Sequence, residues 1–233
     1  MAIELDVKIK EIIQRTYNVK SFRLEPQNID FKAGQFLLVN LKKEPALERY
    51  LSISSSPTEK GHIEFTKKIT DSEFSNKLNS LKVGDYVTIK YPFGNFTLKD
   101  EYKKVAFISG GIGITPIRSI CRYVVDKKLD IDMTLLYGNR TVNDIVFRQD
   151  FEEMQNNFFR LRVVHILSEP TLEIESRVGL IDKKIIEDTI PDYIQRKFYL
   201  CGPPGMVEAM KKILNVELKV SQDNIITENF VGY

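Results

Sequence analysis

The stretch Val105-Ala106-Phe107-Ile108-Ser109-Gly110-Gly111-Ile112-Gly113-Ile114-Thr115-Pro116 decides the fold of this chain. An apolar run typical of a buried strand ends in a glycine-rich loop, and a helix is predicted to begin at Thr115-Pro116. Because glycine has no side chain, the backbone can approach a pyrophosphate closely there. The N-terminus of the helix then favours the anion. The stretch therefore predicts the phosphate-binding end of an α/β nucleotide domain.

A second segment also has the residue types of a phosphate site. Arg49-Tyr50-Leu51-Ser52-Ile53-Ser54-Ser55 places a cation and several hydroxyls at the start of a predicted strand. The guanidinium of Arg49 suits a phosphate, and Ser52 and Ser54 share one strand face. Taken alone, an ordinary strand start with a surface arginine explains the segment equally well. Two phosphate sites imply two nucleotide cofactors and electron transfer between them.

Composition limits the classes of protein to consider. The 233 residues carry a net charge of +2 and 42% hydrophobic residues, which suffices for two small cores and requires no nucleic-acid partner. The lysine pairs are scattered, which favours solvated surface; a basic face that docks an acidic protein is the alternative. No apolar run is long enough to span a bilayer, and the N-terminus does not resemble a signal peptide.

The two cysteines, Cys121 and Cys201, are too few for a four-thiolate iron–sulfur cluster or a disulfide framework. A reducing, cytoplasmic location is therefore expected. His62 and His165 lie in predicted strands without ligand spacing around them. No metal site is predicted.

Residues 1–99 are predicted to form an antiparallel β-barrel, because short strand patterns alternate with turn signals. The expected strands are Ile3–Ile13, Val19–Glu25, Gln35–Leu41, Tyr50–Ser54, His62–Lys68 and Asp85–Tyr91. A short helix is expected near Phe74–Leu81. Free N–H groups at its start are suited to a pyrophosphate, and Ser75 either caps the helix or bonds the phosphate.

Residues 100–233 are predicted to form an α/β domain on a parallel sheet, because strand and helix patterns alternate after the charged stretch Lys99–Lys103. Thr115 is the expected N-cap of the helix after the glycine loop, with Pro116 at its first position. The expected strands are Lys104–Ser109, Asp132–Tyr137, Leu161–Leu167, Lys197–Cys201 and Asn224–Glu228. The expected helices bury Ile117, Ile120, Cys121, Val124 and Val125; Phe147, Phe151, Met154 and Phe158; and Met206, Val207, Met210, Ile213 and Leu214.

Together these motifs resemble the ferredoxin–NADP reductase superfamily of flavoproteins. Any one motif is weak, but the whole set in register along almost the entire chain is highly specific. The matching segments are Gly34-Gln35-Phe36, Arg49–Ser55, Phe74–Leu78, Gly84-Asp85, Pro92-Phe93-Gly94-Asn95-Phe96, Gly110–Pro116, Tyr137-Gly138-Asn139-Arg140 and Cys201-Gly202-Pro203-Pro204-Gly205-Met206. The resemblance implies a barrel that binds FAD and an α/β domain that binds NADH or NADPH, with both rings in the crevice between them.

The resemblance also implies site residues. The flavin side comprises Arg49, Tyr50, Leu51, Ser52, Ile53, Ser54, Lys67, Phe74 and Ser75. The nicotinamide side comprises Gly110, Gly111, Gly113, Thr115, Pro116, Gly138, Asn139, Arg140, Ser168, Glu169, Cys201, Gly202, Pro203 and Met206. Cys201, Ser52, Thr115 and Tyr233 are the residues expected to act at the reacting rings. Leu51 departs from the family pattern, which often has an aromatic there that packs on the flavin.

Three of the implied roles have a structural alternative. Cys201 lies at the carboxyl end of a strand, where ligands of parallel sheets bind, and the family places this cysteine beside nicotinamide C4; a buried structural thiol is the alternative. Thr115 either reaches a ring or only caps the helix. Tyr233 either shields the flavin, with Gly232 giving it freedom to swing, or belongs to a frayed terminus.

The choice of nicotinamide rests on the segment after strand Leu161–Leu167. Glu169 repels the 2′-phosphate of NADPH and is able to accept a hydrogen bond from a free 2′-hydroxyl. Arg140 and Arg177 argue the other way, and NADH is favoured.

The expected function is a flavin-dependent NAD(P)H oxidoreductase. Hydride passes from nicotinamide C4 to flavin N5, and electrons go on to a separate ferredoxin, flavodoxin or cytochrome. A reductase of free flavin and an FAD-containing electron-transfer subunit of a larger complex are the alternatives.

Overall fold

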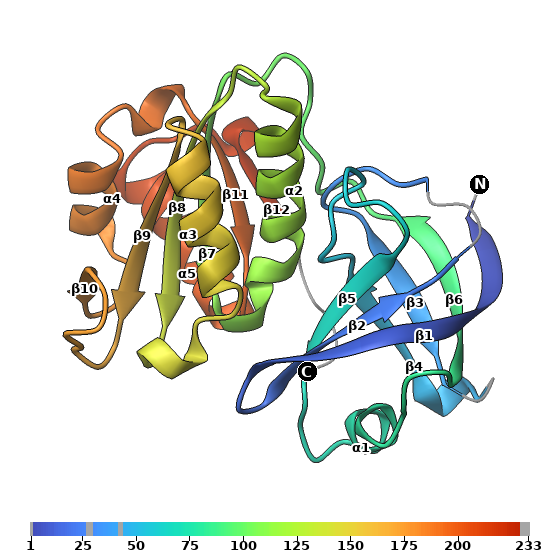
Figure 1. The fold of residues 1–233 in the computed structure, drawn as a ribbon. Coiled ribbons are helices and arrows are strands. Elements are labelled where there is room, and N and C mark those ends of the chain that lie inside the picture. The colour runs from blue at the N-terminus through green and yellow to red at the C-terminus, as the bar shows by residue number, and fades with distance from the viewer. Residues whose placement is uncertain (1, 27–29, 42–43, 229–233) are drawn as a thin grey trace.

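The computed structural model describes residues 2–26, 30–41 and 44–228. They form two domains that lie side by side, a mainly β domain from the N-terminal half and an α/β domain from the C-terminal half (Figure 1). The helix α2 (Ile114–Lys127) is the helix of the second domain that lies against the first.

The first domain is an antiparallel sheet that closes into a barrel. Within the described residues it has six strands in the order β4-β3-β6-β1-β2-β5. A bridge between Ile53 and Phe65 joins the end of β4 to β5. The strands are β1 (Ile3–Thr16), β2 (Val19–Leu24), β3 (Phe36–Asn40), β4 (Glu48–Ser52), β5 (Ile63–Lys68) and β6 (Tyr86–Phe93). The predicted antiparallel barrel is confirmed, and each predicted strand overlaps an observed one.

The inward-pointing apolar side chains of the strands, which alternate with outward-pointing polar ones, fill the barrel. Along β1, Val7 and Ile9 are buried while Lys8 between them is exposed, as a strand with one wet face requires. Phe22 of β2 and Phe65 of β5 stack inside the barrel with ring centroids 5.2 Å apart. These rings make the barrel a packed core.

The short helix α1 (Glu73–Asn79) covers one end of the barrel (Figure 1). Its N-cap is Ser72, whose hydroxyl oxygen accepts a hydrogen bond from the Ser75 N–H at 3.3 Å. The prediction that Ser75 caps this helix is therefore wrong. The Ser75 hydroxyl instead lies 3.1 Å from the hydroxyl of Thr70.

The second domain is built on a parallel sheet, as predicted. In the described part of the chain it has six strands in the order β10-β9-β8-β7-β11-β12. The strands are β7 (Lys104–Gly110), β8 (Asp132–Asn139), β9 (Leu161–Leu167), β10 (Ser176–Val178), β11 (Lys197–Cys201) and β12 (Ile225–Glu228). The single-turn elements are η1 (Pro45–Leu47), η2 (Gly111–Gly113), η3 (Val142–Asp144), η4 (Tyr193–Gln195), the π-helical η5 (Ile213–Glu217) and η6 (Gln222–Asn224).

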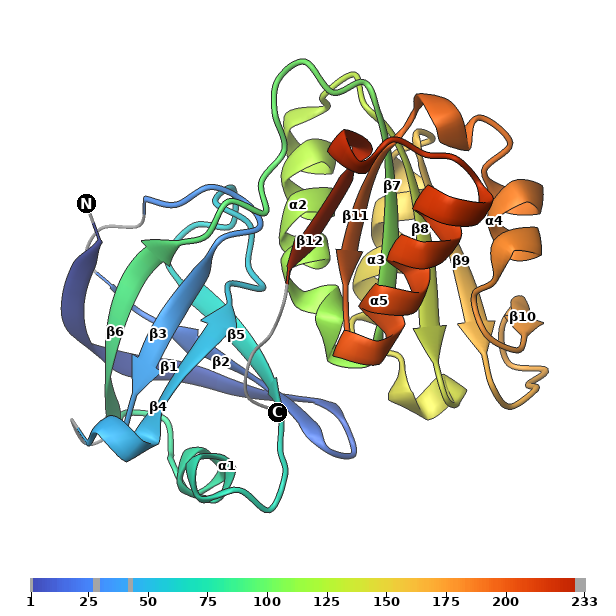
Figure 2. The same ribbon diagram turned by 180° about the vertical axis from the view of Figure 1, so that it is seen from behind.

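Helices cover both faces of the parallel sheet. On one face lie α2 and α3 (Arg148–Asn157), and on the other α4 (Lys183–Thr189) and α5 (Pro204–Lys212) (Figures 1 and 2). Successive side chains of β7 point to opposite faces of the sheet: Phe107 packs with α2 and Ile108 with α5. None of the helices in the described ranges combines the length and apolar character needed to cross a membrane.

The start of α2 differs from the prediction. The helix begins at Ile114 with Gly113 as N-cap, after the tight turn η2. Thr115 is inside the first turn, and its hydroxyl donates to the Ile112 carbonyl oxygen at 3.1 Å. The predictions of Thr115 as N-cap and Pro116 at the first helical position are therefore wrong. The glycines already form a turn, so the helix starts earlier than the proline pattern indicates.

Candidate functional site

The glycine loop after β7 packs against the segment after β11. A Cβ on Gly113 would lie 2.3 Å from the carbonyl oxygen of Cys201, which the backbone cannot accommodate. A Cβ on Gly110 would lie 2.5 Å from the sulfur of Met206. Gly111 has φ +52° and open space around its Cβ position. The loop is thus clamped on one side and leaves the Gly111 backbone open on the other.

That open side faces a cavity of about 610 Å³. The cavity lies at the carboxyl ends of β7, β8 and β9 and beside the start of α5, where nucleotides bind in parallel α/β sheets. Of the predicted nicotinamide residues, those lining it are Gly110, Gly111, Gly138, Asn139, Arg140, Ser168, Pro203 and Met206. An open glycine loop at this position fits the pyrophosphate of a dinucleotide.

The other predicted nicotinamide residues lie around the cavity rather than on its wall. Gly113, Thr115, Pro116, Cys201 and Gly202 form the packed layer behind the glycine loop, where Pro116 and Thr115 are buried. Glu169 follows the cavity residue Ser168 and accepts a hydrogen bond from Arg140 Nε at 3.0 Å. This ion pair is exposed, so both side chains remain accessible to a ligand.

Sequence reasoning missed the part of the cavity that the barrel supplies. Tyr17, Asn18 and Val19, at the hairpin between β1 and β2, line the cavity together with Lys68 of β5. The Tyr17 hydroxyl donates to Asp144 Oδ1 at 2.9 Å, which ties the hairpin to the α/β domain. No local sequence pattern predicts this contact, because Tyr17 and Asp144 come together only when the two domains pack against each other.

Cys201 ends β11 in register with Ser109 of β7 and Glu228 of β12. Burial raises the pKa of the Cys201 thiol, and the neighbouring Glu228 raises it further. The sulfur is therefore a neutral thiol and a poor nucleophile. This agrees with a role in orienting a ring and not in covalent chemistry.

Glu228 is a second group that sequence reasoning did not assign. Its Oε2 is shielded from solvent and has no hydrogen-bond partner within residues 2–26, 30–41 and 44–228, and the Ser109 hydroxyl is in the same state. Burial raises the pKa of Glu228 to about 7. The available signal was a carboxylate at the carboxyl end of the last strand, next to the predicted cysteine.

On the barrel side, Arg49 of β4 is held by its neighbours. Its Nη1 donates to the carbonyl oxygen of Glu48 at 2.6 Å, and its guanidinium lies 5.4 Å from the centre of the Phe74 ring of α1. Lys67 of β5 lies near enough for the charge of Arg49 to lower its pKa, after burial, which is the larger cause. Two neighbouring cations form a site that suits a pyrophosphate.

Ser52 and Leu51 follow Arg49 and are both buried. The Ser52 hydroxyl has no hydrogen-bond partner among the residues that the structure describes. Buried polar groups are nearly always paired, so a buried hydroxyl without a partner fits a polar ligand such as a flavin ring. The residues at this site therefore fit FAD.

The other flavin candidates use their side chains within the protein. Tyr50 points away from Leu51 and packs edge-on against Phe36, with centroids 5.5 Å apart. Ile53 lies in the barrel core. The Ser54 hydroxyl donates to Glu64 Oε1 at 2.9 Å. Tyr233 lies outside the described residues.

Two domain families match the chain. The oxidoreductase FAD-binding domain matches residues 4–98, and the oxidoreductase NAD-binding domain matches residues 107–212. The chain therefore carries a domain for each of the two cofactors that the resemblance implies.

Reductases dominate the similar proteins. The chain is 31% identical over 219 residues to the glycine betaine monooxygenase reductase subunit of Chromohalobacter salexigens, covering 90% of this chain and 60% of the relative. It is 27% identical to NADH-cytochrome b5 reductase 2 of Aspergillus terreus, covering 88% of this chain and 68% of that protein. The chain thus spans about three fifths of the first of these relatives.

Solved structures have the same fold. A cytochrome P450 reductase of Amycolatopsis superposes with a TM-score of 0.87 at 24% identity, over 99% of this chain and 71% of that one. The ferredoxin reductase of carbazole 1,9a-dioxygenase superposes with a TM-score of 0.85 at 25% identity, over 99% and 70% of the two chains. With both domain families matched in order and the two-domain fold shared, the chain belongs to the ferredoxin–NADP reductase superfamily.

Proposed function

We propose that this protein is a flavoprotein reductase that takes hydride from NADH and delivers electrons to a separate redox protein. The observation that carries the proposal is the pairing of two sites across the domain interface. The open glycine loop at Gly111 lies in the α/β domain. The barrel carries the neighbouring cations Arg49 and Lys67, and on the same strand as Arg49 the Ser52 hydroxyl, which has no hydrogen-bond partner among the described residues. The names of the relatives, all reductases, support the same activity.

FAD, when bound, supplies a two-electron acceptor for hydride and releases electrons singly. The proposed barrel domain, residues 1–99, would hold it through the charges of Arg49 and Lys67. Phe74 of α1 would support Arg49 through its ring, and Ser75 would support the start of α1. Ser52 donates or accepts a hydrogen bond at the ring, and Leu51 covers it. Tyr50, Ile53 and Ser54 would hold this strand in place, since their side chains pack or bond within the protein.

The proposed nicotinamide domain is residues 100–233. The backbone of the glycine loop holds the pyrophosphate of NADH, and Met206 and Pro203 bound the slot for the ring. Cys201, Thr115 and Glu228 orient the ring from the layer behind the loop. Their packing excludes water from the place where the rings meet, which favours hydride transfer over side reactions.

The electron acceptor is a redox protein that docks where the flavin is reachable. Ferredoxin, flavodoxin and cytochrome are the candidate classes, and the relatives' names add an oxygenase component. Both cysteines, Cys121 and Cys201, are buried, and two thiols are too few to supply the four thiolates of an iron–sulfur cluster. Free thiols also support a cytoplasmic location.

We further propose NADH over NADPH. Glu169 lies beside the cavity and its carboxylate is paired only with the exposed guanidinium of Arg140 within the described residues. The Glu169 carboxylate would repel the 2′-phosphate of NADPH, whereas the 2′-hydroxyl of NADH is able to donate a hydrogen bond to it.

A second candidate function is a reductase of free flavin. The observation that favours it is Leu51, which replaces a stacking aromatic with an aliphatic side chain and weakens the hold on the ring.

The deciding experiment is an anaerobic titration of the purified protein, followed by visible absorbance. Bleaching of a bound flavin band by NADH, and slowly or not at all by NADPH, supports the main proposal. A colourless protein that reduces added flavin selects the second candidate. A yellow protein that neither nicotinamide bleaches contradicts both and selects the electron-transfer subunit of a larger complex.

A further inference from the structure

Arg118 of α2 crosses the domain boundary. Its side chain is buried, with 4% of the residue exposed. Nη1 donates to the carbonyl oxygen of Ser54 at 3.0 Å, and Nη2 donates to Glu59 Oε1 at 3.0 Å. Nη1 also contacts the second carboxylate oxygen of Glu59. Ser54 and Glu59 belong to the barrel half of the chain, so one guanidinium fork bonds the helix of one domain to the other.

The same guanidinium is fixed on its own side. Arg118 Nε donates to Asp150 Oδ2 of α3 at 2.9 Å. Its carbon Cζ lies 5.4 Å from the centre of the Phe147 ring, and Arg15 of β1 approaches that ring at 4.8 Å. Arg15 in turn pairs with the buried Glu64 at 3.0 Å. The group Arg15, Glu59, Glu64, Arg118 and Asp150, here the interdomain cluster, is a continuous network of charges from both domains.

A neighbouring bond repeats the pattern. The Ser119 hydroxyl donates to the carbonyl oxygen of Ser55 at 2.7 Å, and both residues are fully buried. Consecutive residues of α2 therefore bond consecutive carbonyls of the barrel. Because two adjacent residues of α2 are bonded to the barrel, the contact fixes the orientation of the helix relative to the barrel as well as its distance from it.

These anchors stand close to both proposed ring sites. Arg118 follows Gly113 by five residues of continuous helix, about 7.5 Å at the helical rise. Ser54 follows Ser52 by two residues of extended chain, about 7 Å at the strand rise. A short, rigid piece of backbone thus connects the glycine loop to Arg118, and another connects Ser52 of the proposed flavin site to Ser54. The hydrogen bond between Arg118 and Ser54 therefore links the two proposed sites.

We propose that Arg118 is a positioning residue, which with Ser119 holds the nicotinamide loop and the flavin strand in the register that hydride transfer needs. The inference rests on the proposed function and names a determinant of its rate. Reacting atoms must approach to about 3–3.5 Å, and a misplacement of about 1 Å costs about 100-fold in rate. A buried ionic network contributes little net stability, and here its geometry joins two domains.

The test uses the pair variant Arg118→Met with Glu59→Gln, which removes one charge of each sign. Asp150 loses its bonds to Arg118 but keeps Arg15, whose Nη1 lies 4.0 Å from Asp150 Oδ1. The matched control is Arg122→Met with Glu153→Gln. Arg122 lies one turn further along α2, and its bond to Glu153 at 3.2 Å stays within the α/β domain.

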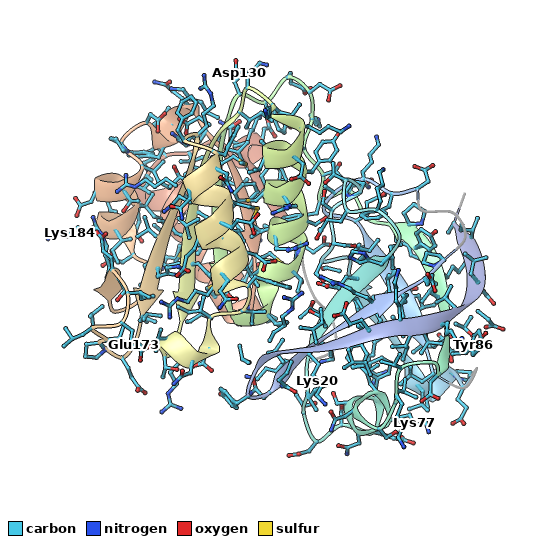
Figure 3. All side chains as sticks on the ribbon, viewed as in Figure 1. Lys20, Lys77, Tyr86, Asp130, Glu173 and Lys184 are labelled. Carbon is cyan, nitrogen blue, oxygen red and sulfur yellow. The ribbon has the colours of Figure 1, made fainter. Side chains whose placement is uncertain are left out.

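The first measurement is made on the purified protein as isolated and without nicotinamide. Spin labels are attached at Tyr86→Cys and Lys184→Cys, which lie on the far sides of the two domains (Figure 3). Cys121 and Cys201 are fully buried and stay unlabelled. Pulsed electron paramagnetic resonance should give a broader or shifted distance distribution in the Arg118 pair variant and an unchanged one in the control. An unchanged distribution in the Arg118 pair variant overturns the inference.

The second measurement is the single-turnover reduction of bound FAD by NADH. The limiting rate should fall about tenfold or more in the Arg118 pair variant, while the Kd for NADH changes less than about twofold. A limiting rate equal to that of the control overturns the inference. If the unsubstituted protein is not reduced by NADH, the proposed function fails, whereas the distance distributions still decide whether Arg118 holds the domains.

Discussion

Gly113 and Cys201 are in direct backbone contact: a Cβ on Gly113 would lie 2.3 Å from the carbonyl oxygen of Cys201. The contact presses the end of β11 against the glycine loop after β7. It joins the two segments that the proposed nicotinamide site needs, and it leaves no room for any side chain.

Gly113→Ala should destabilise the protein by about 1–3 kcal/mol, because the backbone of Cys201 must move. The control is Gly205→Ala in α5, where nothing lies within 4 Å of the Cβ position. Alanine there should be neutral or stabilising, by up to about 1 kcal/mol, since it favours the helix. Urea unfolding of both variants checks the pair, and equal stabilities would contradict the packing argument.

Ser52→Ala and Ser54→Ala should separate function from stability. The Ser52 hydroxyl has no partner among the described residues, so its loss should cost little stability while slowing flavin reduction about tenfold or more. The Ser54 hydroxyl bonds Glu64 and lies 2.8 Å from the Thr66 hydroxyl, so its loss should cost about 1–3 kcal/mol. Unfolding curves and stopped-flow reduction check both. The reverse order would show that Ser52 is the structural serine.

Glu228→Gln should remove a pH dependence of stability. The Glu228 pKa is raised to about 7 in the folded protein, so the unfolded chain releases this proton at lower pH than the folded one. Stability therefore falls as pH rises from the unfolded pKa to about 7, by up to about 3 kcal/mol at about 1.4 kcal/mol per pKa unit.

The Glu228→Gln variant should match the unsubstituted protein near pH 4 and exceed it at pH 8. Glu208→Gln, on the exposed side of α5, serves as the control. Urea unfolding across this pH range provides the measurement. A variant that is no more stable than the unsubstituted protein at pH 8 would show that the carboxylate is well solvated.

Glu169→Gln should shift the preference between nicotinamides. Removing the carboxylate removes its repulsion of a 2′-phosphate and leaves Arg140 free to pair with it, so kcat/KM for NADPH should rise about tenfold. Glu173→Gln is the control, since its nearest ionic partner is Arg148 at 4.0 Å. Steady-state rates with NADH and NADPH give the ratio. An unchanged ratio would place the 2′-position elsewhere.

Local patterns recovered most of the fold. The predicted strands overlap observed ones, and the predicted apolar faces of α2 and α5 pack into the core. These predictions succeed because the spacing of apolar residues along a strand or helix reflects which of its faces is buried. Sequence patterns do not predict β10 or α4. Three residues carry too little periodicity for β10, and α4 lacks a helix-start pattern like Phe74–Leu78, which predicts α1, a helix of the same length. Ser75 and Thr115 were assigned as caps on residue type, but Ser72 and Gly113 hold those positions.

The two-domain class, the glycine loop and the segments expected at each nucleotide are predictable from local sequence, because they depend on residues adjacent in the chain. The residues that meet across the interface are not predictable in this way. Tyr17 with Asp144 and Arg118 with Glu59 are each far apart in the sequence. Their contacts depend on how two separately folded domains pack, and no periodicity within either domain encodes that packing.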